Sequence, residues 1–222
     1  MTSEVLALLE GASALLLDFD GPLAALMPPP ANAQAADAAL AVLDGVELPN
    51  DIATTTDHLA VLRWSLEHLP APLMLEVEAA CTQAEVAAAA DCREAVNCSA
   101  LFEHAERAGL PVGVVSNNAA AAVRAFLQRT GRLGSVEVIS ARTPDTVEWL
   151  KPRPELLLTA AVALRVNVGE VVFVGDAVSD VIASKRVGCR SLGLYKNASR
   201  KAELEEAGAD AVWPIDSQVA IR

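Results

Sequence analysis

The sequence predicts an α/β protein, with a doubly wound parallel sheet and a helical insertion after the first strand. Two observations carry this prediction. Short apolar runs that end at polar or glycine residues alternate with helical stretches, and one long segment, from about 31 to 109, has no convincing strand pattern. Runs this apolar fit strands covered on both faces, as in a parallel sheet. Alternation of strands and helices favours right-handed crossovers, and therefore a doubly wound sheet.

The expected strands are five apolar runs: ALLLD (14–18), VGVVS (112–116), VEVIS (136–140), VVFVGD (171–176) and SLGLY (191–195). Helical stretches separate the last four of these runs, at 119–131, 154–165 and 180–188. The second, third and fourth runs are therefore each followed by the helix that a parallel crossover needs, whereas the first is followed by the long segment without strands.

The segment from about 31 to 109 has helical patterning instead. Four leucines recur at helical spacing along one face: Leu59, Leu62, Leu66 and Leu69. We therefore expect an α-helical cap domain over residues 26–104, inserted between the two parts of an α/β core domain, 1–25 and 105–222.

Composition and charge exclude several classes of protein. Hydrophobic residues make up 53% of the 222 residues, which indicates a globular chain. The formal net charge of −12 argues against broad binding to nucleic acid or to an anionic membrane, because both need a basic surface. No apolar stretch reaches the length of a membrane span, and an acid stands where a secretion signal needs a basic residue, so we expect a cytoplasmic protein. The four cysteines lack paired metal-site spacing and are expected to be reduced thiols.

Polar side chains gather at the carboxyl ends of the expected strands, where open α/β sheets bind their ligands. The set comprises Asp18 and Asp20 after the first strand, Ser116 and Asn117 at the second, Lys151 between the third and fourth, and Asp176 with Asp180 after the fourth. Taken singly, each pattern also fits a turn, a helix cap or a surface loop. Four such coincidences at correctly ordered positions are improbable, so we expect these groups to converge on one site.

In combination, the motifs resemble the haloacid dehalogenase superfamily. The resemblance rests on LLLDFDGPL (15–23), GVVSNN (113–118), KPRPELLLTAAVAL (151–164), VVFVGDAVSDVIASKRVG (171–188) and the tail ELEEAGADAVWPI (203–215). The sequence is most similar to phosphatases of the phosphoglycolate phosphatase kind, which carry a helical cap after the first strand. This resemblance implies a Rossmann-like core and Mg²⁺-dependent hydrolysis of a small phosphorylated metabolite.

The resemblance also implies a role for each residue of the set. Asp18 resembles the nucleophile that forms an aspartyl-phosphate, and Asp20 the general acid and base. Ser116 would donate a hydrogen bond to a phosphoryl oxygen, and Lys151 would hold the nucleophile and the phosphoryl group together. The backbone N–H of Phe19 would also face the phosphate. Asn117 and Arg153 are further candidates for substrate binding.

The same resemblance implies a Mg²⁺ site made by Asp18, Asp176 and the backbone carbonyl of Asp20. Asp180 would complete it, by holding a metal-bound water or by positioning Lys151. Oxygen ligands of this kind suit Mg²⁺ and would serve zinc poorly. Like-charge crowding should also raise the pKa of one carboxyl group, and leaving-group protonation requires a protonated Asp20.

Other functions stay open at this point. A phosphosugar mutase would use the same aspartyl-phosphate, and the sequence does not separate it from a hydrolase. A carbon–halogen hydrolase is disfavoured, because those relatives need neither Asp20 nor a Mg²⁺ site. A degenerate binding or regulatory protein is a third alternative, encouraged by Pro22 where the family commonly has threonine. Arg63, in the expected cap, fits a solvated helix face better than an anion site, and the histidines are expected at packing or surface positions.

Overall fold

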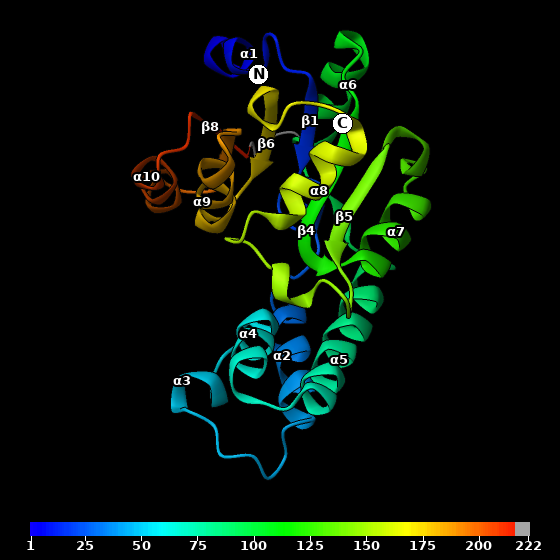
Figure 1. The fold of residues 1–222 in the computed structure, drawn as a ribbon, viewed down its shortest axis with the longest axis vertical. Coiled ribbons are helices and arrows are strands. Elements are labelled where there is room, and N and C mark those ends of the chain that lie inside the picture. Colours follow the sequence, from blue (N-terminus) through cyan, green and yellow to red (C-terminus); the bar gives the residue numbers. More distant parts are fainter. Residues whose placement is uncertain (216–222) are drawn as a thin grey trace.

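The computed structural model describes residues 1–215, and its centre is a six-stranded parallel sheet (Figure 1). The strands, in sheet order, are β5 (Val138–Arg142), β4 (Val112–Ala119), β1 (Ala14–Leu17), β6 (Val171–Gly175), β7 (Arg190–Tyr195) and β8 (Ala211–Pro214). Every neighbouring pair is parallel. The five predicted strands and the α/β fold class are confirmed, and β8 is a strand that the prediction lacked. The end of the expected core domain, 216–222, lies outside the described residues.

Helices cover both faces of the sheet. They are α1 (Ser3–Leu9), α6 (Cys98–Ala108), α7 (Ala120–Arg129), α8 (Glu155–Leu164), α9 (Val178–Val187) and α10 (Ala198–Ala207). Three short 3-10 segments lie between them: Leu133–Ser135, Val147–Trp149 and Val168–Glu170.

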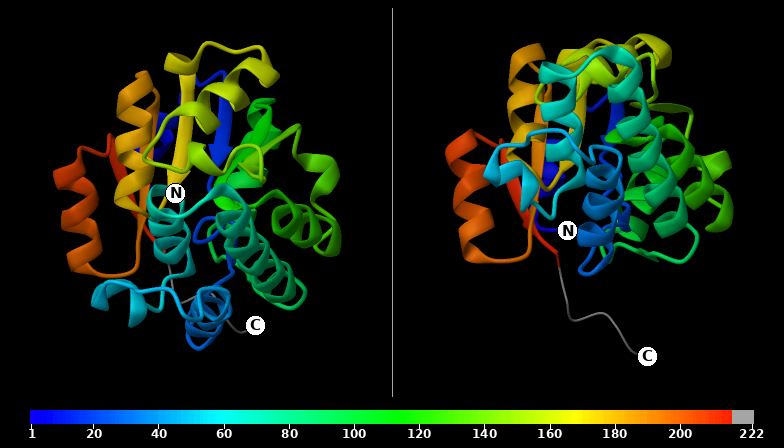
Figure 2. Two further views of the ribbon diagram at one scale, coloured as in Figure 1. Left: turned by 60° about the horizontal axis from the view of Figure 1, so that its bottom comes forward. Right: turned by 90° about the horizontal axis from the view of Figure 1, so that it is seen from below.

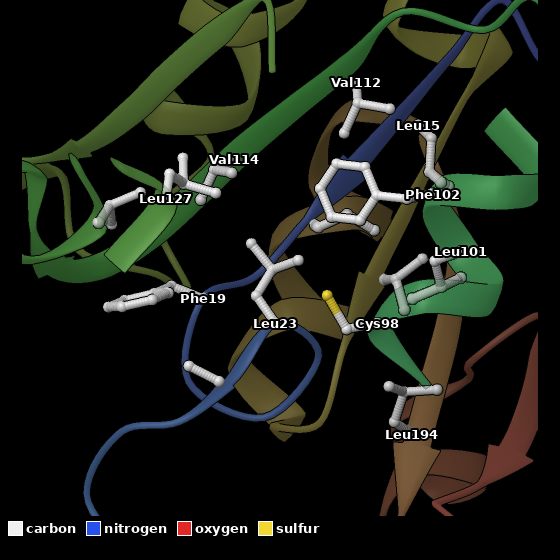
Figure 3. Packing of buried hydrophobic residues seen from close by; sticks show 14 of the residues in the cluster. Leu15, Phe19, Leu23, Cys98, Leu101, Phe102, Val112, Val114, Leu127 and Leu194 are labelled. Carbon is white, nitrogen blue, oxygen red and sulfur yellow. The ribbon is translucent and has the colours of Figure 1, made fainter. Parts of the chain in front are cut away.

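Strand β1 shows how completely the sheet is buried, since none of its four residues is accessible to solvent. Leu15 and Leu17 belong to one hydrophobic cluster, together with residues of α1, α6 and α7 (Figure 3). Ala14 and Leu16 belong to a second cluster, together with residues of α8 and α9. Successive side chains of a strand point to opposite faces, so a continuous apolar run is what a sheet covered on both sides requires.

The segment between β1 and β4 contains the four remaining helices: α2 (Ala31–Ala41), α3 (Asn50–Ala53), α4 (His58–His68) and α5 (Ala71–Ala89). Helices α2, α4 and α5 pack on one another around a hydrophobic cluster of their own. Val147 and Leu150, which follow β5, complete that cluster. The helical layer therefore lies against one end of the sheet (Figure 1), and its helices lie in front of the sheet when the molecule is seen from below (Figure 2).

The absence of strands expected for 31–109 needs one correction. Two very short strands, β2 (Ala24–Ala25) and β3 (Arg93–Glu94), pair in antiparallel fashion. Two residues are too few to produce a periodic pattern in a sequence, so β3 left no signal. Helix α6 also packs on the sheet, in the same cluster as β1. From this packing we propose that the cap consists of α2 to α5 and that α6 belongs with the core.

None of the helices in residues 1–215 combines the length and the hydropathy needed to cross a membrane.

Candidate active site

A cavity of about 330 Å³ lies at the carboxyl ends of the central strands, between the sheet and the helical layer. Six of the residues singled out in the sequence line it: Asp18, Asp20, Asn117, Lys151, Asp176 and Asp180. The opposite wall comes largely from the start of α4 and includes Thr56, His58, Leu59 and Arg63. The strands thus bring together groups that are far apart in the sequence, as parallel topology requires.

Lys151 is the electrostatic centre of the cavity floor. Its side chain is 2% exposed, and Nζ lies 2.9 Å from Oδ1 of Asp18 and 2.7 Å from Oδ1 of Asp180. Burial lowers the pKa of Lys151, but the two carboxylates outweigh it and raise the pKa above its ordinary value. The ammonium group therefore stays charged and bridges Asp18 to Asp180.

Asp18 ends strand β1 in a fixed orientation. Its Oδ1 accepts a hydrogen bond from the backbone N–H of Phe19 at 2.7 Å. The same oxygen forms the ion pair with Lys151. Among the described residues, no hydrogen-bond donor contacts Oδ2. Burial raises the pKa of Asp18 to about 6, although Lys151 partly offsets this effect.

Asp18, Asp176 and Asp180 each place one carboxylate oxygen within 4.8 Å of the others. Burial, followed by the charges of Asp180 and Asp18, raises the pKa of Asp176 to about 7. Lys151 supplies one positive charge against this cluster. Three carboxylates, of which Asp18 and Asp180 are buried and Asp176 is partly buried, offer only oxygen donors and fit a hard divalent cation such as Mg²⁺. Gly21 leaves room for the carboxylate of Asp176, because a Cβ atom at position 21 would lie 2.5 Å from Cγ of Asp176.

Asp20 is bound to the loop that follows it. Its Oδ1 accepts the backbone N–H of Leu26 at 2.9 Å. Burial raises the pKa of Asp20 above its ordinary value, and the hydrogen bonds from the backbone of Leu26 and Met27 offset only part of this shift. A carboxyl group with a raised pKa suits the expected role of Asp20 as a proton donor.

Ser116, Asn117 and Phe19 are buried beneath the site; Asn117 lines the cavity, whereas Ser116 and Phe19 do not. Ser116 is not accessible to solvent, and its Oγ donates to Oδ1 of Asn118 at 3.2 Å. The Asn117 side chain bonds to the backbone of Lys151 twice, accepting from its N–H at 2.7 Å and donating to its carbonyl oxygen at 3.1 Å. Asn117 therefore holds Lys151 in place. The Phe19 ring packs edge-on against Phe126 in the core, and only its backbone is directed toward Asp18.

Of the two candidate arginines, Arg63 lines the cavity that contains Asp18 and Arg153 does not. Arg153 forms an ion pair with Glu155 at 2.7 Å and lines a neighbouring hollow instead of the cavity that contains Asp18. Arg63 lines both. Its nearest acid, Asp57, lies 3.6 Å away, beyond a good hydrogen bond, so the guanidinium of Arg63 faces the cavity weakly paired.

Sequence reasoning missed a buried group of charges beside the cavity. Nε2 of His58 lies 2.8 Å from Oε1 of Glu85, which is not accessible to solvent. Glu85 also forms an ion pair with Arg142 at 2.6 Å. His58 is buried, but it also lines the cavity, and its carboxylate partner lies 27 residues away in the sequence. One signal was available, because Arg142 stands at the carboxyl end of β5, where the other strands carry their site residues.

The fold and the site define an α/β enzyme that gathers carboxylates at the carboxyl ends of parallel strands. The family model of the haloacid dehalogenase-like hydrolases matches residues 65–194, which is more than half of the chain. The protein therefore belongs to this family.

Relatives with known names are similar over shorter segments. The phosphoglycolate phosphatase of Escherichia coli (strain K12) is 34% identical over 105 residues, which cover 47% of this chain and 41% of that protein. The phosphoglycolate phosphatase of Neisseria meningitidis (serogroup A) is 33% identical over 86 residues, or 39% of this chain and 36% of that protein. The chain thus spans about two fifths of the length of the curated relatives it matches.

Solved structures are similar over almost the whole chain. The structure of CbbY from Rhodobacter sphaeroides in complex with phosphate has a TM-score of 0.69 and 25% identity, and the match covers 91% of this chain and 93% of that one. A mutant of CbbY in complex with xylulose-(1,5)-bisphosphate has a TM-score of 0.70 over the same shares, also at 25% identity. These similarities agree with the fold and with the helical layer over the cavity.

Proposed function

We propose that the protein is a Mg²⁺-dependent phosphatase of a small phosphorylated metabolite, and that it acts through an aspartyl-phosphate on Asp18. The observation that carries this proposal is the contact of Lys151 with Asp18 and Asp180, beside Asp176, on the floor of one cavity. A volume of about 330 Å³ suits a small metabolite and excludes a folded protein. The phosphatase relatives, and the phosphate and bisphosphate bound to CbbY, support the same substrate class.

The reaction would proceed in two displacements. In the first, a carboxylate oxygen of Asp18 forms a bond to phosphorus while the bond from phosphorus to the leaving oxygen breaks. Asp20 donates its proton to that oxygen. In the second, Asp20 takes a proton from water as the water oxygen attacks phosphorus. Inorganic phosphate leaves, and the Asp18 carboxylate is restored.

The neighbouring groups would stabilise the negative charge on the phosphoryl group during this reaction. Lys151 would contact the phosphoryl oxygens while it keeps Asp18 oriented, and the backbone at Phe19 would add an N–H donor. Asp18, Asp176 and the backbone carbonyl of Asp20 would hold Mg²⁺, and Asp180 would hold a metal-bound water or position Lys151. Bound Mg²⁺ would offset the repulsion between an anionic substrate and these carboxylates.

Hydrolysis of p-nitrophenyl phosphate and of phosphoglycolate tests the proposal, with Mg²⁺ or with EDTA, in the wild type and in Asp18→Asn. We expect Mg²⁺-dependent release of inorganic phosphate by the wild type and a loss of at least about 10³-fold in the variant. Full activity of a folded Asp18→Asn variant contradicts the mechanism. Because a mutase returns the phosphoryl group to its product, sustained release of inorganic phosphate also separates hydrolysis from mutase chemistry.

A further inference from the structure

A buried ion network connects the helical layer to the sheet. Arg142, the last residue of β5, is not accessible to solvent, yet its guanidinium has a partner for each of its three nitrogens. Nη2 donates to Oε2 of Glu85 at 2.6 Å, and Nη1 forms an ion pair with Glu78. Both glutamates belong to α5, so Arg142 joins an inserted helix to a core strand.

The third nitrogen of Arg142 connects this network to the active site. Nε donates to the carbonyl oxygen of Asn117 at 2.9 Å. The side chain of Asn117 in turn holds the backbone of Lys151 with two hydrogen bonds. Lys151 reaches Asp18 through Nζ. A continuous series of contacts therefore runs from Glu85 on α5 to Asp18, the residue that we propose attacks phosphorus.

Glu85 also contacts the end of β4 through a second set of hydrogen bonds. Its Oε2 accepts the backbone N–H of Ala119 at 2.6 Å, and its Oε1 accepts from Nδ2 of Asn118 at 3.1 Å. Asn118 accepts the hydrogen bond of Ser116 at 3.2 Å. Glu85 thus anchors the whole segment that follows the centre of β4. Burial raises the pKa of Glu85, but the hydrogen bond from His58 and the charge of Arg142 outweigh it, so the carboxylate stays ionised.

Stability alone does not account for a network of this kind. Taking two carboxylates and a guanidinium out of water carries a large desolvation cost, and apolar residues of similar volume would hold a helix to a sheet at least as well. What an ion network adds is a fixed arrangement of the groups that it contacts. Here those groups are the backbone that carries Ser116 and the backbone that carries Lys151.

We propose that Arg142 and Glu85 are positioning residues, which hold Lys151 and Ser116 in their reactive arrangement only while α5 is seated on the sheet. The inference rests on the proposed phosphatase function. In the absence of this network, the cavity would keep its acids but lose the fixed placement of Lys151. Cap seating and catalysis are thereby linked through the interior of the protein.

The decisive variant is Arg142→Lys, which keeps a buried positive charge but loses the Nε donor to Asn117. Its control is Arg132→Lys, because Arg132 also pairs with a glutamate, Glu94, at 2.6 Å, but lies away from the cavity near the surface. We expect Arg142→Lys to lower kcat for p-nitrophenyl phosphate by roughly 10- to 100-fold, because a misplacement of about 1 Å costs this much. KM should change little, and Arg132→Lys should leave both constants unchanged.

A second measurement tests the positioning of Lys151 without any turnover. The chain has four lysines, and only Lys151 is buried, so its Nζ resonance stands apart in a ¹⁵N-lysine NMR spectrum. We expect Glu85→Gln, which adds no lysine to the spectrum, to shift this resonance or broaden it, while the backbone amide spectrum retains the dispersion of a folded protein. Glu94→Gln, a change at the partner of Arg132, should leave the resonance in place.

The outcomes separate the inference from the proposed function. An unchanged Lys151 resonance in Glu85→Gln together with an unchanged kcat in Arg142→Lys overturns the inference, and so does an equal effect of Arg132→Lys on kcat. If the wild type hydrolyses no phosphate ester while the Lys151 resonance still responds to Glu85→Gln, the phosphatase proposal fails and the link between Glu85 and Lys151 stands.

Discussion

Gly175 and Asp180 lie so close together that a Cβ atom at position 175 would be 2.2 Å from Oδ2 of Asp180. No real Cβ contact is this short, so any side chain at 175 must displace the carboxylate that pairs with Lys151. Gly175 ends strand β6, and its φ is not in the left-handed region, so the requirement for glycine here is one of space.

Gly175→Ala should therefore damage the active site more than the fold. Displacing Asp180 disturbs its contact with Lys151, and we expect turnover to fall by roughly 10- to 100-fold, with a loss of about 1–3 kcal/mol in the free energy of unfolding. The control is Gly134→Ala, because no atom lies within 4 Å of a Cβ at that position. Assays of kcat together with urea unfolding of both variants make the comparison. Equal activity in the two variants would remove Asp180 from the mechanism.

Mg²⁺ should stabilise the wild type but not Asp176→Asn. We expect the cluster of Asp18, Asp176 and Asp180 to bind a cation only in the folded state, so saturating Mg²⁺ should add to the free energy of unfolding, by about 2.7 kcal/mol at a hundredfold excess over Kd. Asp176→Asn removes one proposed ligand and one partly buried negative charge beside Asp18 and Asp180, so it should melt higher than the wild type in EDTA and respond weakly to Mg²⁺. Asp37→Asn, an exposed change on α2, is the control. Melting temperatures with and without Mg²⁺ decide the matter.

The Glu85 network should give the protein a distinct sensitivity to acid. The folded pKa of Glu85 lies below its ordinary value of 4.5, because the hydrogen bond from His58 and the charge of Arg142 outweigh burial. A lowered pKa contributes stability that is present above the ordinary value and is lost as the pH falls through the folded value. The other groups that face Glu85 are Glu78 and Cys81 on its own helix.

Glu85→Gln should accordingly be less stable than the wild type by about 3 kcal/mol at neutral pH. The difference should shrink as the pH falls below 4.5. Urea unfolding of both proteins across the range measures it, with Glu94→Gln as a surface control in which a difference of less than about 1 kcal/mol is expected. A difference that grows toward acid pH would mean that Glu85 is protonated in the folded protein.

The two arginines near the cavity should differ in their effect on substrate binding. Arg63 lines the cavity that contains Asp18, whereas Arg153 is paired with Glu155 in the neighbouring hollow. Arg63→Met should raise KM for phosphoglycolate by roughly 10-fold, as expected for a hydrogen bond to a charged group. Its effect on p-nitrophenyl phosphate, which lacks a second anionic group, should be smaller. Arg153→Met serves as the matched comparison, and a larger effect there would reverse the assignment.

The strands and the predicted cavity residues followed from the sequence for a physical reason. A buried parallel strand must be apolar throughout, so runs such as that of β1 are visible in one dimension. The polar residues at their ends are equally visible. Strand β8 was missed because it is short, includes Pro214 and is only partly buried at Val212 and Pro214, so its pattern resembles that of a loop.

The network of Arg142 and Glu85 could not be predicted in the same way, because no periodic pattern marks an ion pair between distant segments. Glu85 stands in an alanine-rich helix, where a single acid normally faces solvent. The direction of the Arg153 side chain could likewise not be predicted from the sequence. Its nearness to Lys151 in the chain suggested the active site, but the side chain turns to Glu155 instead.

The small ladder between β2 and β3 has a consequence for how this chain can change. Ala24 pairs with Glu94 and Ala25 with Arg93, so the chain departs from the core and comes back to it at neighbouring points. The segment between these points is an insertion whose two ends lie side by side. Segments of different length or composition can be exchanged there while all six strands of the sheet keep their order. The part that we propose contacts the substrate is thereby free to diverge, and the part that carries Asp18 is not.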